Sequence, residues 1–265
     1  MSELDIRALS KAFGGVHAVN EVSFSVGKGE FLAMIGPNGA GKSTCFNMIN
    51  GQLAPDSGEI HFEGRNIAGL KPRDIFKLGV SRTFQVAATF GSMTVAENVQ
   101  MALISHLGET YQFGKPAASR HKDRALALLD QVGMKDAADR PSRELAYGDV
   151  KRVELAIALA NDPRLLLMDE PTAGMAPRER NNLIALVKRL VLERGISVLF
   201  TEHSMDVVFA HADRIIVLSR GRLIADGNAT SIREDLKVRE VYFGTGKTFA
   251  KAGASKADTP KAETP

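Results

Sequence analysis

The chain has 265 residues, of which 44% are hydrophobic and 25% charged, and this composition excludes a mostly disordered protein. Cys45 is the only cysteine, which excludes an intramolecular disulfide, and no apolar stretch reaches the roughly 18 residues that span a bilayer. The net charge of +3 and the pI near 9.0 are a weak indication of nucleic-acid binding. We do not expect a nucleic-acid partner, because the sequence has no long run of like charges. The polar N-terminus is not a secretory signal, so the cytosol is the simplest compartment.

Short strands are expected in the first third of the chain, where apolar residues alternate or run together. The predicted strands cover residues 4–9, 22–26, 30–35, 59–62 and 80–84. Residues 93–159 are predicted to be mostly helical, because apolar residues recur there at helical spacing, most clearly at 123–132 and 150–159.

The last third mixes strands with helices again. We predict strands at 165–168 and 196–200, a helix at 178–192, and a β-hairpin formed by 214–218 and 222–225. The hairpin turn is expected at Arg220 and Gly221. A further helix should start at Ser204, whose hydroxyl can serve as the N-cap.

The alternation of short apolar strands with helices predicts an α/β fold with a mostly parallel sheet that is covered on both faces. The long helical stretch in the middle indicates an inserted α-helical subdomain. After residue 244 the chain is rich in Lys, Ala, Thr, Gly and Pro and has almost nothing to bury. We therefore predict a disordered tail at 245–265.

A glycine-rich segment follows the predicted strand 30–35 and matches the pattern Gly-x-x-x-x-Gly-Lys-Ser/Thr. Its residues are Gly36, Pro37, Asn38, Gly39, Ala40, Gly41, Lys42, Ser43 and Thr44. Glycines let such a loop turn its N–H groups toward phosphate oxygens, and the following helix adds its positive N-terminal end. In this pattern Lys42 supplies a charge to the outer phosphates and the Ser43 hydroxyl is a ligand of Mg²⁺.

Two carboxylates end the apolar strand 165–168. We expect this strand to lie beside the strand that feeds the glycine-rich loop. Asp169 at its C-terminal end can hold Mg²⁺, usually through water. Because side chains alternate along a strand, Glu170 points elsewhere, toward the γ-phosphate, where a carboxylate can orient and polarise the attacking water.

Together these motifs resemble the ATP-binding subunits of ABC transporters, and the resemblance covers residues 3–244. It implies a P-loop NTPase core with a mostly parallel sheet, an N-terminal antiparallel β subdomain, and an inserted helical subdomain at approximately 90–160. It also implies that the chain binds ATP and Mg²⁺. By the same resemblance Phe13 stacks on adenine, Gln85 reaches Mg²⁺ and the attacking water, and His203 contacts the γ-phosphate.

The segment 145–149 occupies the position of the family's signature sequence, usually LSGGQ, which caps the nucleotide held by the opposite subunit. The residues implied in that contact are Ala146, Tyr147, Gly148 and Asp149. Gly148 is expected to open the helix at 150–159, whose N-terminal amides can face the γ-phosphate.

The signature segment departs from the family pattern. Ala146 lacks the usual hydroxyl, and Asp149 replaces a neutral Gln with an anion. We expect the Asp149 carboxylate to fold back onto the helix N-terminus or to pair with Lys151 or Arg152. Residues 171–175, PTAGM, resemble the loop that crosses the dimer interface.

The resemblance implies an ATPase that is one subunit of a transporter. The sequences RTFQ, MTVAEN, LAYG, PTAGM and REVYFG are most similar to those of importers for branched-chain amino acids and related amides or urea. The implied partners are transmembrane permease subunits, a second ATPase subunit in a homodimer or heterodimer, and indirectly a periplasmic substrate-binding protein. The expected location is the cytoplasmic face of the inner membrane, through the partner subunits.

Three alternatives stay open at this point: the ATPase of an exporter, a soluble ABC ATPase acting on nucleic acid or ribosomes, and a nucleotide-binding scaffold that does not hydrolyse. The second class commonly carries paired ATPase domains or long coiled insertions, and the sequence has neither. Glu170 and His203 argue against the third.

Overall fold

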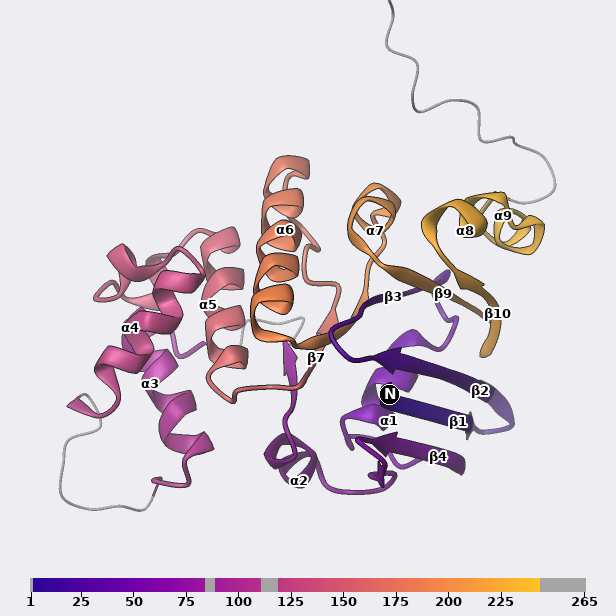
Figure 1. The fold of residues 1–265 in the computed structure, drawn as a ribbon, viewed down its shortest axis with the longest axis horizontal. Helices are drawn as coiled ribbons and strands as arrows, with labels where there is room; N and C mark the ends of the chain where they lie inside the picture. Colours follow the sequence, from indigo (N-terminus) through magenta and orange to yellow (C-terminus); the bar gives the residue numbers. More distant parts are fainter. Residues whose placement is uncertain (1, 84–88, 111–118, 244–265) are drawn as a thin grey trace, which may run out of the picture.

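The computed structural model describes residues 2–83, 89–110 and 119–243. Gln85 and the predicted tail at 245–265 lie outside these ranges. The described strands form two sheets, and most of the described helices cover one face of the larger sheet or gather beside it (Figure 1). Within these ranges, no helix combines the length and the apolar character needed to cross a membrane.

The smaller sheet is antiparallel and comes from the N-terminal part of the chain. Its strands, in spatial order, are β2 (Val16–Gly27), β1 (Ser2–Phe13), β4 (Ser57–Phe62) and β5 (Arg65–Asn66). The two long strands extend beyond the predicted segments, because their polar ends pair as a hairpin up to Phe13 and Val16. This sheet confirms the expected antiparallel β subdomain.

The larger sheet has parallel neighbours except at one edge, where the last two strands form an antiparallel hairpin. Its strands, in spatial order, are β10 (Arg222–Gly227), β9 (Arg214–Ser219), β3 (Phe31–Ile35), β8 (Ser197–Thr201), β7 (Leu165–Asp169) and β6 (Val80–Thr83). The expectation that β7 lies beside β3 is wrong, because β8 lies between them. One crossover helix joins β7 to β8 and makes these two strands neighbours, so β3 pairs with the other side of β8.

The two faces of the larger sheet enter two separate hydrophobic cores. Along β3, Phe31, Ala33 and Ile35 face the core shared with helices, whereas Leu32 and Met34 face the core shared with α1 and the smaller sheet. The sheet is therefore covered on both faces, as predicted. The helices are α1 (Lys42–Ile49), α2 (Pro72–Lys77), α3 (Val95–His106), α4 (Lys122–Gln131), α5 (Tyr147–Leu159), α6 (Pro177–Arg194), α7 (Met205–His211), α8 (Ala229–Glu234) and α9 (Leu236–Phe243).

Helices α3, α4 and α5 lie between β6 and β7 in the sequence and form a group at one end of the molecule, on the left in Figure 1. The start of α3 is fixed by a capping box, in which Thr94 accepts the Glu97 N–H and the Glu97 carboxylate accepts the Thr94 N–H. The helical spacing at 123–132 and 150–159 corresponds to α4 and α5. The helical insert expected from the sequence is therefore present.

Two predicted local features had different outcomes. The hairpin turn between β9 and β10 is confirmed, with φ angles of 48° at Arg220 and 75° at Gly221. The predicted cap at Ser204 is wrong. Helix α7 does begin after this residue, but the hydroxyl accepts a hydrogen bond from the Arg180 guanidinium and caps no backbone N–H. A charged donor is the stronger partner for that oxygen.

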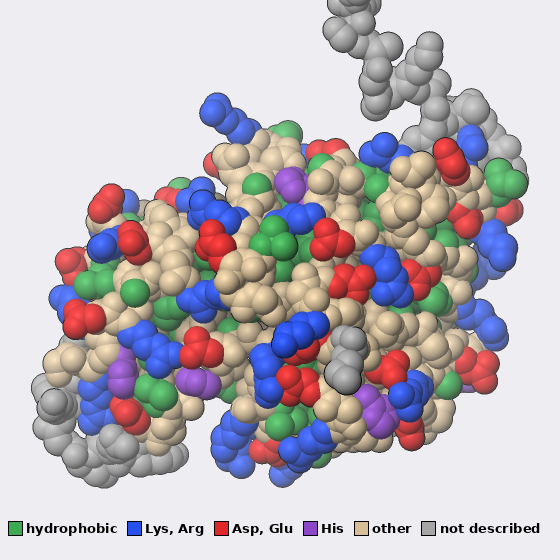
Figure 2. Space-filling view, in the orientation of Figure 1, with side chains coloured by type: hydrophobic (Ala, Val, Ile, Leu, Met, Phe, Trp, Pro, Cys, Tyr) green, Lys and Arg blue, Asp and Glu red, His purple; other side chains and the backbone are tan. Residues whose placement is uncertain are grey.

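The surface carries both signs of charge. On the face drawn in Figure 2, basic and acidic side chains lie interleaved. The described residues include ion pairs such as Lys11 with Asp56 and Arg214 with Asp226, each at 2.6 Å. The hydrogen bonds that Arg214 donates to the Asp226 carboxylate raise the pKa of Arg214. Exposed pairs of this kind contribute little to stability.

Candidate functional site

The glycine-rich loop lies between the end of β3 and the start of α1. Two of its glycines are required by close backbone contacts. A Cβ on Gly36 would lie 2.3 Å from the carbonyl oxygen of Leu218, and one on Gly41 would lie 2.3 Å from that of Ala18. Because these contacts are to backbone atoms, any side chain at either position would displace the loop.

Neighbouring segments hold one side of the loop and leave the other side open. Ala40 is buried, and its carbonyl accepts the N–H of Gly221 from the β9–β10 turn at 3.0 Å. Asn38, Gly39 and Ser43 are exposed. The loop therefore presents backbone and a hydroxyl to a ligand from its open side.

Lys42 places a buried ammonium inside this loop. Its Nζ donates to the carbonyl oxygens of Gly36 at 2.7 Å and Pro37 at 3.2 Å. Burial lowers the pKa of Lys42, and the charges of Glu170 and Asp169 oppose that effect. Among the described residues no carboxylate pairs directly with this ammonium, so an anion can take that place.

Asp169 ends β7 with both carboxylate oxygens engaged. Oδ1 accepts the Thr201 hydroxyl at 2.8 Å, and Oδ2 accepts Nη2 of Arg82 at 3.0 Å. Thr201 lies opposite Asp169 in the β7–β8 register, which explains its contact. Arg82 had no predicted role, because nothing in its own segment indicates a partner on another strand.

Glu170 and His203 form the second polar contact at this edge of the sheet. Nε2 of His203 lies 2.7 Å from Oε1 of Glu170. Glu170 has a positive φ of 49°, a conformation unusual for a residue with a side chain. Its N–H is held by the carbonyl and the hydroxyl of Thr201 at 3.1 and 3.0 Å. This strained backbone turns the carboxylate toward the histidine.

Glu202 is a second residue that the sequence analysis did not single out. Its buried carboxylate accepts the N–H and the hydroxyl of Thr172 at 3.0 and 2.6 Å through one oxygen. The other oxygen accepts the N–H of His203 at 3.2 Å. Glu202 therefore joins the 171–175 loop to the segment that carries His203. The residues next to Glu202 in the sequence do not indicate that its partner is Thr172, which lies 30 positions earlier.

The signature segment lies against the 171–175 loop of the same chain. Helix α5 begins at Tyr147, one residue before Gly148, and Ala146 at the N-cap position makes no side-chain capping bond. A Cβ on Gly148 would lie 3.5 Å from the Met175 side chain. Tyr147, which is half exposed, stands where LSGGQ has a glycine, a departure that the sequence analysis did not mention. Within the described ranges, no hydrogen bond joins this segment to the glycine-rich loop.

The expected contacts of Asp149 are wrong. Lys151 instead pairs with Glu154 at 2.9 Å, and both side chains are buried. Arg152 donates to the carbonyl of Val132 at 3.3 Å. Among the described residues, the Asp149 carboxylate accepts no hydrogen bond, although it lies in the first turn of α5, where the helix dipole favours an anion.

Three further residues complete the set of predicted positions. Phe13 is 51% exposed at the end of β1, where Lys11 Nζ lies 5.8 Å from its ring centroid. Cys45 is buried behind the glycine-rich loop, and burial raises the pKa of its thiol to about 12. Gln85 is not among the residues described.

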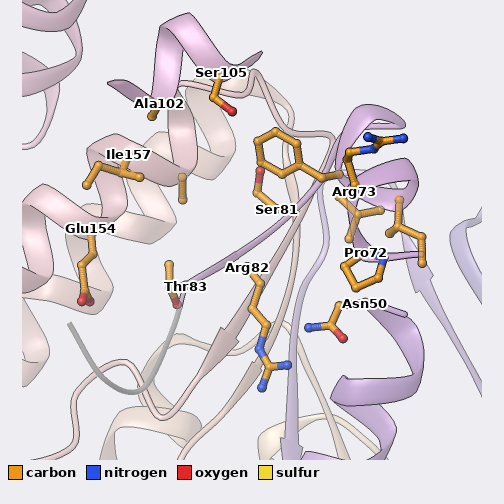
Figure 3. A pocket seen from close by; sticks show the side chains of 14 residues that line it. Asn50, Pro72, Arg73, Ser81, Arg82, Thr83, Ala102, Ser105, Glu154 and Ile157 are labelled. Atoms are coloured by element: carbon orange, nitrogen blue, oxygen red, sulfur yellow. The ribbon is translucent and has the colours of Figure 1, made fainter. Parts of the chain in front are cut away.

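A cavity of about 350 Å³ lies between α2, β6, α3 and α5. Figure 3 shows Ser81, Arg82 and Thr83 of β6 along one wall, with Ala102, Ser105 and Ile157 from the helical insert opposite. The lining is mostly apolar, with Ile75, Phe76 and Val80 contributing large side chains. The cavity therefore lies between the helical insert and the edge strand β6 of the larger sheet.

Several known proteins are similar to this chain in sequence and in fold. Residues 19–173 match the protein family described as ABC transporter. The high-affinity branched-chain amino acid transport ATP-binding protein BraF of Pseudomonas aeruginosa is 38% identical, over 91% of this chain and 97% of that protein. The ADP conformation of an ATP-binding cassette of an ABC transporter is 34% identical, with a TM-score of 0.83 over 92% of this chain and 99% of that one. A dimeric post-hydrolysis cassette bound to ADP and Pi is 27% identical, with a TM-score of 0.72 over 85% of this chain and 98% of that one.

Proposed function

Because the chain belongs to the ABC transporter family, we propose that it powers the uptake of branched-chain amino acids or related small amides through separate permease subunits. It is an ATPase of this family, and its hydrolysis of ATP drives transport. One observation carries the proposal. Lys42, Asp169 and Glu170 lie close enough to interact electrostatically, at or beyond the C-terminal ends of β3 and β7. The Pseudomonas aeruginosa relative is a branched-chain amino acid transport ATP-binding protein, and this similarity supports the cargo class.

The residues present fit a magnesium nucleotide. Lys42 is a buried cation that takes an anion, and the open side of the loop offers N–H groups to phosphate oxygens. Ser43 and Asp169 are hard oxygen donors. Mg²⁺ commonly takes one or two carboxylates, with phosphate oxygens and water completing its coordination. Within the described ranges, no group of three or more His, Cys, Asp or Glu side chains is arranged to hold a metal ion without other ligands.

We assign Ser43, Asp169 and Gln85 to the metal and the 36–44 loop to the phosphates. When bound, Mg²⁺ neutralises charge on the phosphate oxygens. The Thr201 hydroxyl donates to Oδ1 of Asp169, which fixes the direction of the carboxylate. A carboxylate in a fixed orientation holds a hydrated cation at less entropic cost than a free one.

Glu170 is the residue we assign to the attacking water. Its carboxylate orients the water and accepts its proton as the water oxygen bonds to the γ-phosphorus and the bond to ADP breaks. His203, 2.7 Å from that carboxylate, is assigned to the γ-phosphate, so one imidazole can contact both groups. Gln85 is assigned to the same water.

The signature residues Ala146, Tyr147, Gly148 and Asp149 are assigned to the nucleotide of a second ATPase subunit. The exposed Tyr147 and the start of α5 lie beside the 171–175 loop, so one surface carries both segments. The dimeric cassette among the solved relatives supports an association of this kind. Phe13, exposed on the smaller sheet, is assigned to the adenine ring of the nucleotide bound by its own chain.

The permease contact is assigned to the cavity between α2, β6, α3 and α5. An apolar recess of about 350 Å³ suits a few side chains of a short helix. Its wall β6 runs directly into the segment that carries Gln85. A permease bound there would hold the chain at the cytoplasmic face of the inner membrane. A periplasmic substrate-binding protein would act on the same permeases from the other side.

Phosphate release tests the enzymatic assignments. Glu170→Gln should bind ATP with unchanged affinity and release at least about 100-fold less phosphate than the wild type, because the proton acceptor is removed. Glu193→Gln is the matched control, since it neutralises an exposed carboxylate on α6, far along the helix from the site. Normal turnover by Glu170→Gln would contradict the assignment.

Uptake in membrane vesicles tests the transport proposal. The full complex with its permeases should accumulate branched-chain amino acids only when ATP is supplied, and Glu170→Gln in the same complex should abolish accumulation. Purification with nucleic acid or ribosomes in place of integral membrane proteins would favour the soluble alternative.

A further inference from the structure

Arg82 joins the cavity to the carboxylate of Asp169. It lies on β6, and its side chain lines the cavity. In Figure 3 its guanidinium extends away from Ser81 and the side chains of the helical insert. Nη2 donates to Oδ2 of Asp169 at 3.0 Å, and both side chains are nearly buried. One residue therefore touches both the apolar recess and the carboxylate that we assign to Mg²⁺.

The guanidinium is shared among several partners. Nη1 donates to Oδ1 of Asn47 at 2.7 Å and to Oε1 of Gln52 at 3.1 Å, so Arg82 also binds the helix that follows the glycine-rich loop and the turn after it. Its Cζ lies 5.9 Å from the Phe46 ring centroid. Nε is buried and has no hydrogen-bond partner among the described residues. A guanidinium with one unsatisfied donor gains from a rearrangement that satisfies it.

We propose that Arg82 is a positioning residue that restrains Asp169 while the cavity is empty, and that a permease helix filling the cavity draws the guanidinium away and strengthens the hold on Mg²⁺. This inference rests on the proposed function, which assigns Asp169 to the metal and the cavity to the permease. It makes Arg82 the link by which docking in the cavity changes the nucleotide site.

The sign of the effect follows from charge. A guanidinium on Oδ2 occupies a lone pair and places a positive charge beside the position of a divalent cation, which it repels. The site has low exposure, so water screens this repulsion weakly. Removing the charge should therefore tighten metal binding. A helix in the cavity contacts the Arg82 stem and can offer an acceptor to Nε, and either contact competes with the bond to Asp169.

Direct metal binding to the isolated full-length chain tests the first half of the inference. Mn²⁺ is titrated in the presence of ADP and followed by electron paramagnetic resonance, a readout that needs no turnover. Arg82→Met should bind Mn²⁺ at least about threefold more tightly than the wild type, because a repelling charge is lost. Arg82→Lys keeps the charge and should stay within about twofold. Arg73→Met, which removes a charge from the same cavity without a bond to Asp169, should leave the Mn²⁺ affinity unchanged.

The complex with its permeases tests the second half. Wild-type chain in the complex should bind Mn²⁺ more tightly than the isolated chain, whereas Arg82→Met should show equal affinity in both forms. Arg82→Gln serves as a second neutral variant, and thermal melting followed by circular dichroism establishes that each variant is folded.

If Arg82→Met and Arg82→Gln bind Mn²⁺ no more tightly than the wild type, the inference about Arg82 is overturned and the proposed function is not. A wild-type chain that binds no Mn²⁺ with ADP would overturn the proposed function as well.

Discussion

Nε2 of His203 lies 2.7 Å from Oε1 of Glu170, and the two residues come from loops at the ends of different strands, β8 and β7. The contact exists because Glu170 adopts a positive φ of 49°, held by two bonds from its N–H to Thr201. The strained backbone of Glu170 fixes its carboxylate against the imidazole of His203. A carboxylate held in one position is suited to accepting a proton from a water bound beside it.

Replacing His203 should lower the rate of ATP hydrolysis without a comparable loss of nucleotide affinity. We expect His203→Gln to lower ATP turnover by at least about 100-fold and to change nucleotide affinity by less than about threefold, because the imidazole acts on the γ-phosphate and on Glu170. His211→Gln is the matched control on α7, where burial lowers the pKa of the imidazole and no catalytic role is assigned. Turnover near the wild-type value in His203→Gln would remove the histidine from the reaction.

Lys42 should lower the free energy of unfolding of the chain when no nucleotide is bound. Burial lowers its pKa, so the folded state disfavours the charged ammonium relative to the unfolded state. This penalty is fully present below the folded pKa and disappears as the pH rises through that pKa toward the unfolded one. Lys42→Met should therefore raise the melting temperature at pH 7 by about 2–4 °C, which corresponds to about 1 kcal/mol.

The same Lys42→Met variant should lose ATP binding. Lys188→Met, which removes a lysine bonded to Asp213 on another surface, should gain no stability. A melting temperature of Lys42→Met below that of the wild type would show that the ammonium stabilises the empty loop.

Asp149→Gln should raise turnover in the dimer. Among the described residues no basic side chain holds the Asp149 carboxylate, and it lies in the first turn of α5, the helix whose start we assign to the nucleotide of a second subunit. Since the residue is partly exposed and therefore screened by solvent, we expect an increase of about threefold. Phosphate release at low and high ionic strength checks this, and the gain should shrink with salt. An unchanged rate at low salt would mean that the carboxylate points away from the nucleotide.

Glu202 should couple the 171–175 loop to His203. Thr172→Val keeps the shape of the side chain and removes its hydroxyl bond to Glu202, which should cost about 1–2 kcal/mol of stability. If the coupling matters for the reaction, kcat should fall while KM for ATP stays constant. Thr230→Val on α8 is a control for removing a threonine hydroxyl elsewhere. Equal kcat in Thr172→Val and the wild type would leave Glu202 with a structural role only.

Local structure could be predicted from the sequence where it depends on consecutive residues. The 36–44 loop, the strand that ends in Asp169 and Glu170, and the hairpin turn at Arg220 all depend on neighbours in the chain, so their local geometry follows from the pattern. The helical insert follows from the helical spacing of apolar residues, whereas the antiparallel sheet was expected from a family resemblance. The solved relatives share that architecture.

Contacts between distant residues could not be predicted in this way. Arg82 reaches Asp169 across 87 positions, and Thr172 reaches Glu202 across 30. The order of β3, β8 and β7 depends on which crossover forms, and short apolar strands do not encode it. The error at Asp149 has a local cause instead, because Lys151 has a better partner in Glu154 one turn along the helix.

The central claim is that ATP holds this chain to a second ATPase chain through the glycine-rich loop of one and the signature segment of the other. Light scattering of Glu170→Gln measures this directly, because blocked hydrolysis preserves the complex. We expect a single-chain mass without nucleotide and twice that mass with Mg-ATP, either alone or mixed with the second ATPase subunit of the transporter. A single-chain mass with Mg-ATP in both samples would contradict the account.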